Sequence, residues 1–157
     1  MKAIFVLAIA KHQDICEHGI DAFLSPFVSD LKSLYLDGIT VTMDGENRMF
    51  YGGLLAMLAD NLAAHTLGGF KESHSFALRI CRTCLVTTEQ AQAFFSENSV
   101  QMRTEQSHEQ QCELLHGSLL GHFSTTYGIN RRSVLMDIPG FSVISGLDPT
   151  RHNARSI

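Results

Sequence analysis

The stretch IDAFLSPFVSDLKSLYLDGITVTM, residues 20–43, decides the fold class. Its first part repeats apolar residues at helical spacing, which predicts an amphipathic helix with one face toward a core. The apolar positions are Ile20, Phe23, Leu24, Phe27, Val28, Leu31, Leu34 and Tyr35. Pro26 interrupts this pattern. With Ser25 as N-cap and Pro26 at the first helical position, we expect the helix to restart there.

A turn and a strand follow this helix. Asp37-Gly38 predicts a helix stop, and Ile39–Met43 alternates with β-branched residues, as is typical of a strand. Residues 44–47 predict a turn. Upstream, the continuously apolar segment Ala3–Ala10 predicts a strand covered on both faces. That segment also resembles a very short signal peptide, but its apolar run is at the lower limit for one, so the strand is favoured.

The segment from Phe50 to Ala59 leaves two interpretations open. Its Leu, Met and Ala content favours a helix. Alternatively, it is a buried strand ending in Asp60, followed by a helix from Asn61 to Leu67 and a stop at Gly68-Gly69. The order strand, helix, strand, strand predicts an α/β or mixed α+β fold.

Composition limits the class of protein. The 157 residues are 45% hydrophobic and 18% charged, which indicates one globular domain. The net charge of −4 argues against a strongly basic surface that grips DNA. No stretch approaches the roughly 20 apolar residues of a membrane span. We therefore expect an intracellular protein, of the nucleus or cytoplasm, that does not bind a membrane.

The motif with the clearest chemistry is Cys81-x-x-Cys84, whose spacing suits two thiolate ligands of a tetrahedral zinc ion. His108 and Cys112 lie four residues apart, on one face of a helix that Ser107 could cap, and we expect them to complete a structural zinc site. His116 or His74 could replace one of these ligands. Two other interpretations remain: the pair are buried small residues, or a redox couple.

Asp60 is the second candidate. A carboxylate at the end of an apolar strand is a common metal ligand in α/β folds, but an N-cap of the helix from Asn61 is the alternative, and the residues alone favour the cap. The chain contains no GxGxxG and no GxxxxGK[ST] motif, so we expect no nucleotide cofactor.

Several short motifs in order resemble the CACTA (En/Spm-like) DDE transposases and proteins derived from them. The matching residues run from 18 to 148: His18-Gly19-Ile20-Asp21, Leu24, Leu31, Gly38-Ile39, Phe50 to Ala63, Leu67 to Phe70, Cys81 and Cys84, Arg103-Thr104 with His108, Tyr127-Gly128-Ile129, Leu135, Ile138 and Phe141. The resemblance implies an RNase H-like core with an inserted zinc knuckle. It also implies that Asp60 ends a strand and matches a catalytic aspartate.

The resemblance further implies three parts: residues 1–70 as a strand-helix-strand part of the core, 71–130 as the zinc-knuckle insertion and 131–157 as a truncated return to the core. The stretch 148–153 is a distorted form of the family's D-x-M-H motif. Two-metal catalysis needs several converging carboxylates, and only Asp60 matches, so magnesium is expected only if a catalytic site survives. We expect a transposase-derived fragment with structural zinc that is inactive alone. The alternative is a zinc-stabilised module that binds protein or nucleic acid, with acidity favouring a protein partner or self-association over DNA.

Overall fold

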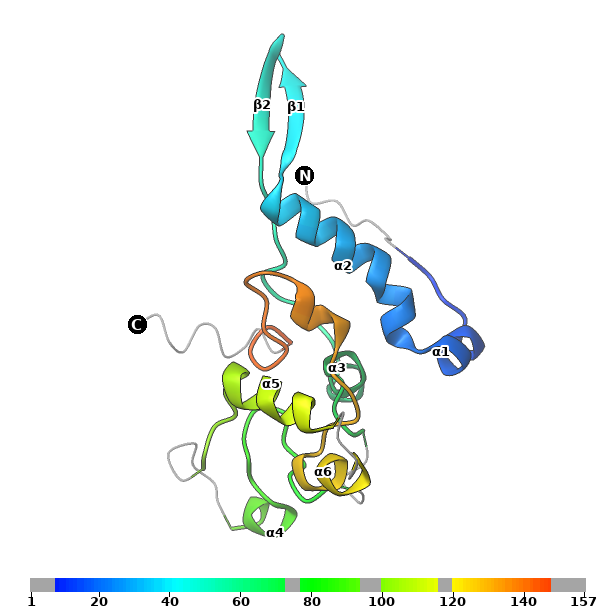
Figure 1. The fold of residues 1–157 in the computed structure, drawn as a ribbon, viewed down its shortest axis with the longest axis vertical. Coiled ribbons are helices and arrows are strands. Elements are labelled where there is room, and N and C mark those ends of the chain that lie inside the picture. The colour runs from blue at the N-terminus through cyan, green and yellow to red at the C-terminus, as the bar shows by residue number, and fades with distance from the viewer. Residues whose placement is uncertain (1–7, 73–76, 94–99, 116–119, 148–157) are drawn as a thin grey trace.

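The computed structural model describes residues 8–72, 77–93, 100–115 and 120–147 (Figure 1). Its elements are α1 (His12–His18), α2 (Ile20–Leu36), β1 (Ile39–Met43), β2 (Glu46–Phe50), α3 (Asn61–Gly68), α4 (Thr88–Ala91), α5 (Glu105–Leu114), α6 (Leu120–Tyr127) and the 3-10 helix η3 (Val134–Asp137). The mixed α+β class is thus confirmed at this level, with one two-stranded sheet in the described residues. No helix in these ranges is both long and apolar enough to cross a membrane.

Helix α2 runs without a break from Ile20 to Leu36, so the predicted restart at Ser25 is wrong. Pro26 lies inside the helix, and the Ser25 hydroxyl donates to the Asp21 carbonyl at 2.7 Å. Because Ser25 is helical, its hydroxyl bonds back to the preceding turn instead of capping a new one. The missing N–H of a proline removes one helix hydrogen bond, and the helix tolerates that loss near its N-terminal end.

Strands β1 and β2 form an antiparallel hairpin, which confirms the predicted strand Ile39–Met43. Asp44 and Gly45 both have positive φ, at 54° and 80°. This is the combination that a two-residue hairpin turn of type I′ requires. The turn is therefore shorter than predicted, because Glu46 and Asn47 already belong to β2.

The segment after the hairpin forms neither of the structures considered for it. Residues 51–60 contain no helix and no strand, so the strand expected to end at Asp60 is wrong. The backbone instead bonds to distant parts of the chain: Gly52 N–H donates to the Leu34 carbonyl at 3.3 Å and Met57 N–H donates to the Gly146 carbonyl at 2.8 Å. These partners replace the regular hydrogen bonds that a strand would need.

Helix α3 confirms the predicted helix from Asn61 and its stop at Gly68-Gly69. Gly69 adopts φ 77° and donates from its N–H to the last turn, as a helix C-cap does. A side chain at this position would collide with the Arg131 carbonyl, so the stop also allows two chain segments to approach. The predicted strand Ala3–Ala10 lies mostly outside the described residues, and residues 8–10 are not in a strand.

One buried apolar cluster joins distant parts of the described chain. It draws on all three parts that the sequence suggested, since Val28 and Ala64, Cys112 and Ile129, and Leu135 are members of one buried cluster. The complete cluster is Val28, Ala64, Phe70, Cys112, Leu115, Ile129, Leu135, Ile138, Phe141, Val143, Ile144 and Leu147. The hairpin contributes no residue to it and extends beyond the C-terminal end of α2 (Figure 1).

Candidate functional site

Cys81 and Cys84 lie at the two ends of a tight turn, and both thiols are reduced. The Cys84 N–H donates to the Cys81 Sγ at 3.3 Å, and Thr83 Oγ1 lies 3.3 Å from the same sulfur. Burial acts to raise the pKa of Cys81, but hydrogen bonds from Cys84 and Thr83 outweigh it and hold this pKa below its ordinary value. The turn thus favours a thiolate at Cys81.

His108 and Cys112 share one face of α5, as their spacing predicts. The His108 Nε2 lies 3.7 Å from the Cys112 Sγ, and both residues are fully buried. The helix is capped by Thr104 and not by Ser107: the Thr104 hydroxyl accepts from the Ser107 N–H, and the Ser107 hydroxyl accepts from the Thr104 N–H. Because this reciprocal cap needs Ser107 in the third helical position, α5 begins earlier than predicted.

Burial makes both of these side chains neutral near pH 7. It lowers the pKa of His108 to about 4, with help from the positive charges of Arg103 and Arg132. Burial also raises the pKa of Cys112 to about 11, with help from the negative charge of Glu109. The imidazole stacks on Phe70, with ring centroids 4.9 Å apart, and its Nδ1 has no hydrogen-bond partner among the described residues. The pair therefore behaves as part of the core.

The guanidinium of Arg103 connects the Cys81 turn to α5. It donates to the carbonyls of Cys81 at 3.3 Å and Tyr127 at 2.9 Å, and to the Gln111 side chain on α5. The same group lies over the Phe70 ring, 5.4 Å from its centroid. Only 4% of Arg103 is exposed, and this burial lowers its pKa to about 10, so it remains charged.

The four predicted zinc ligands therefore form two pairs, with a buried cation bonded to both segments that carry them. Within the described ranges, no group of three or more His, Cys, Asp or Glu side chains could hold a metal ion. Cys81 and Cys84 fit one half of a thiolate site, whereas His108 and Cys112 do not supply the other half in this arrangement. The substitutes His74 and His116 lie outside the described residues, so zinc binding stays a prediction.

Asp60 is the N-cap of α3. Its Oδ1 accepts the N–H of Ala63 at 2.7 Å, which is the interpretation that the residues alone favoured. A capping carboxylate stabilises the positive N-terminal end of a helix without any metal. Among the described residues, Asp60 is not part of any group of three or more His, Cys, Asp or Glu side chains that could hold a metal ion. Its catalytic role and the associated magnesium therefore also stay predictions.

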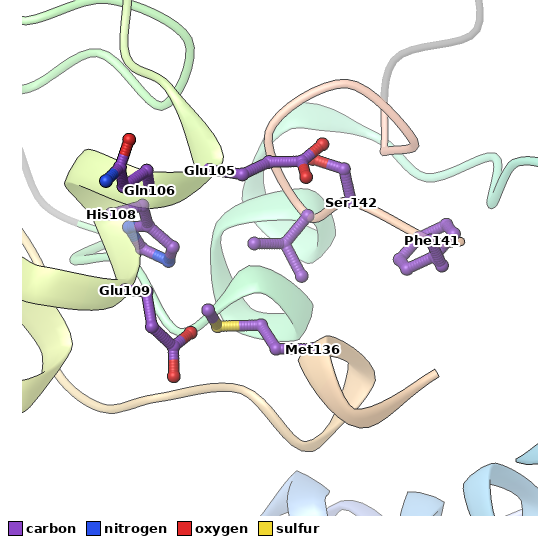
Figure 2. Close-up of a pocket in the computed structure, with 8 residues that line it drawn as sticks. Glu105, Gln106, His108, Glu109, Met136, Phe141 and Ser142 are labelled. Atoms are coloured by element: carbon purple, nitrogen blue, oxygen red, sulfur yellow. The ribbon is translucent and has the colours of Figure 1, made fainter. Parts of the chain in front are cut away.

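Two cavities lie beside these side chains. One of about 370 Å³ is lined by Cys81, His65 and Asn61, among others. The other, of about 260 Å³, lies between α5 and the segment after η3 (Figure 2). In Figure 2, Glu105 extends from α5 toward Ser142. Since His108 on its wall is fully buried, this cavity gives a ligand little access to the imidazole.

The hairpin carries a different kind of site. In an antiparallel pair, residues directly opposite lie on the same face, and the register pairs Ile39 with Phe50, Val41 with Arg48, and Met43 with Glu46. These six residues define what we call the apolar hairpin face: Ile39, Val41, Met43, Glu46, Arg48 and Phe50. Its four apolar side chains are 53%, 37%, 44% and 44% exposed for Ile39, Val41, Met43 and Phe50.

The opposite face of the hairpin is mainly polar. The Thr42 hydroxyl donates to the Asn47 side chain at 2.7 Å, and Thr40 lies opposite Met49. The base of the hairpin contacts α2, because the Gly52 N–H donates to the Leu34 carbonyl. Gly38, with φ 70°, lies so close to the Phe50 carbonyl that a side chain at this position would collide with it. The hairpin is therefore held in place while its apolar face stays uncovered.

Sequence reasoning missed Arg103 and the exposure of the hairpin. The sequence analysis named Arg103 only as part of a family motif. The signal for its role is a single arginine between the CxxC motif and a polar helix, where it can hydrogen-bond to both. The alternation of Ile39–Met43 predicted the strand but not that its apolar side would lack a cover. Comparisons with protein-family models, with curated proteins and with solved structures found no match to this chain.

Proposed function

We propose that this chain is a protein-interaction module of a transposase-derived protein, and that it acts through the apolar hairpin face. One observation carries the proposal. Strand β1 alternates apolar and polar residues as a half-buried strand does, yet all ten residues of the two hairpin strands are exposed.

The stability of an isolated hairpin depends on what covers it. A two-stranded hairpin is only marginally stable in water unless a further layer covers its apolar side. Exposed apolar patches on soluble proteins commonly mark interaction sites. Here the hairpin base is anchored on α2 by the Gly52 hydrogen bond, so the apolar hairpin face is presented to a partner in a defined orientation.

The origin named in this proposal rests on the ordered sequence motifs that resemble those of the transposases, whereas the interaction function rests on the hairpin. The proposal does not assign strand-transfer activity to this chain, because Asp60 serves α3 as a cap and several carboxylates would be required for two-metal chemistry.

Charge favours protein over DNA as the partner. The hairpin has two acidic residues, Asp44 and Glu46, for one basic residue, Arg48, and the whole chain has a net charge of −4. Contacts to phosphate depend on Lys and Arg. The hairpin tip would therefore repel a nucleic-acid backbone.

Photo-crosslinking tests this function at matched positions. Benzoylphenylalanine replaces Val41 on the apolar hairpin face, or Thr42 on the opposite face, in the chain expressed in its own cells. The expected result is a discrete protein adduct from position 41 that is absent from position 42. Equal adducts from both positions, or adducts that a nuclease removes, would contradict the proposal.

Zinc belongs to the proposal only through Cys81 and Cys84, where adjacent thiols and a low Cys81 pKa suit a thiolate ligand. Mass spectrometry of the purified chain tests this. We expect one zinc per chain, lost on Cys81→Ser and retained on His108→Gln, because His108 and Cys112 do not supply the remaining ligands in this arrangement. If a folded His108→Gln variant contained no zinc, the site would use all four ligands predicted from the sequence. Wild-type protein without metal would refute zinc binding altogether.

A further inference from the structure

The charges on the apolar hairpin face balance each other. Arg48 Nη2 and Glu46 Oε2 form an ion pair at 3.3 Å, and both side chains are more than half exposed. They lie two residues apart along β2, opposite Val41 and Met43 on β1. The face thus has an apolar part along β1 and one charge of each sign along β2.

A surface with one positive and one negative group is complementary to itself. A two-fold axis places the same patch of two identical chains in contact, and Arg48 of each copy can then meet Glu46 of the other. We propose that the apolar hairpin face binds the same face of a second copy of this chain. This inference rests on the proposed function and names the partner of the same site.

Other occupants fit the charges less well. A nucleic acid would bring phosphates toward Asp44 and Glu46, with only Arg48 to attract them. A partner surface of a single sign would meet a like charge at either Arg48 or Glu46, and like charges in contact oppose binding. A second copy satisfies both charges and covers the apolar side chains together.

The size of the face limits the strength of this dimer. Five residues of a strand extend only about 17 Å. Two such strands side by side therefore bury much less area than the roughly 800 Å² per partner of a stable interface. Leu36 and Tyr51, which lie next to the hairpin along the chain, are also exposed, by 58% and 65%. We therefore expect a weak dimer, with a dissociation constant on the order of 10 to 100 μM.

Sedimentation velocity of the full chain from about 5 to about 500 μM covers this range. The expected result is a sedimentation coefficient that rises with concentration toward that of a dimer. Val41→Asp should weaken the association at least about tenfold, because it buries a charge in the apolar part. The matched control is Thr42→Asp, which adds the same charge to the opposite face and should leave the association unchanged. Circular dichroism checks that both variants are folded.

A charge exchange tests the two-fold arrangement itself. Arg48→Glu leaves two acidic groups on the face, and Glu46→Arg leaves two basic groups, so each variant alone should dimerise several-fold more weakly than wild type. An equimolar mixture pairs opposite charges and should associate at least as well as wild type. A mixture no stronger than either variant alone would overturn the proposal.

The failure of this inference differs from the failure of the proposed function. A wild-type chain that stays monomeric at about 500 μM, while position 41 still crosslinks to a different protein, overturns the second copy and leaves the interaction module standing. Monomeric protein without any position-specific crosslink overturns both.

Discussion

The hairpin β1–β2 and the region around Arg103 differ in where their polar and apolar groups lie. Around Arg103, a charged side chain is buried and its hydrogen bonds join the Cys81 turn, α5 and the end of α6. In the hairpin, five large apolar residues are exposed and the two strands pair with each other. The contrast shows a charged group satisfied inside the molecule in one region and apolar groups left in contact with water in the other.

The two regions should therefore respond differently to substitution. A change at Arg103 removes hydrogen bonds from buried or partly buried groups, whereas a change on the hairpin affects groups that already contact water. Helix α2 contacts Arg131 through Asp21 at one end and the hairpin base at the other. The loss of free energy of unfolding on substitution compares the two regions directly.

The largest loss is expected from Arg103→Met. The substitution removes the donor from two partly buried backbone carbonyls and from the buried Gln111 amide oxygen, which should reduce the free energy of unfolding by about 3 to 5 kcal/mol. Urea denaturation followed by circular dichroism measures it. The matched control is Lys32→Met, at an exposed position on α2, which should stay within about 0.5 kcal/mol of wild type. Equal losses for both would refute the role of Arg103.

The next largest effect depends on pH. His108 has an ordinary pKa of 6.5 when unfolded and about 4 when folded, so the unfolded chain binds the proton more tightly. Stability is complete above pH 6.5 and declines as the pH falls toward 4, by up to about 3 kcal/mol in total.

Denaturation at pH 7, 6 and 5 measures this decline in the wild type and in His108→Gln. The variant should lose most of the pH dependence between 7 and 5, where few carboxylates titrate. His18→Gln, at an exposed position at the end of α1, should keep it. An unchanged slope in His108→Gln would show that another group is responsible.

A smaller effect is expected where α2 meets the rest of the molecule. Asp21 forms an ion pair with Arg131 and accepts the Val134 N–H at 3.4 Å. Both charged side chains are about one third exposed, so solvent screens the pair and Asp21→Asn should cost about 1 kcal/mol. The loss should shrink in 1 M salt. Asp30→Asn, exposed on the same helix, is the control and should show neither the loss nor the salt dependence.

Local patterns predicted the elements of this fold better than its contacts. The helix from Ile20, the strand Ile39–Met43 and the helix from Asn61 follow from periodicity and from stops at Gly38 and Gly69. These signals are local, because spacing and backbone preference act within a few residues. The same reasoning gave a wrong prediction for residues 51–60. Their backbone bonds to Leu34 and Gly146, and no local pattern encodes these distant partners.

The candidate sites show the same limit. Spacing along a helix predicted that His108 and Cys112 lie side by side, and the structure pairs them. Whether they reach Cys81 and Cys84 depends on the path of the chain between the two motifs, and Arg103 from that path bonds to both segments. The exposure of the apolar hairpin face likewise depends on what packs against it, which alternation alone does not specify.

The smallest expected effect gives the sharpest comparison, because one substitution can be made in both regions. Val41→Thr on the hairpin and Val143→Thr in the core exchange a methyl for a hydroxyl of similar size. Val143 is 3% exposed, so its new hydroxyl is buried and should cost about 1 to 3 kcal/mol. Val41 is exposed, so its variant should stay within about 0.5 kcal/mol of wild type. Denaturation at a few micromolar, below the expected dimer range, measures both. A loss at Val41 as large as that at Val143 would mean that the chain itself covers the apolar hairpin face, and a docking surface would then have no basis.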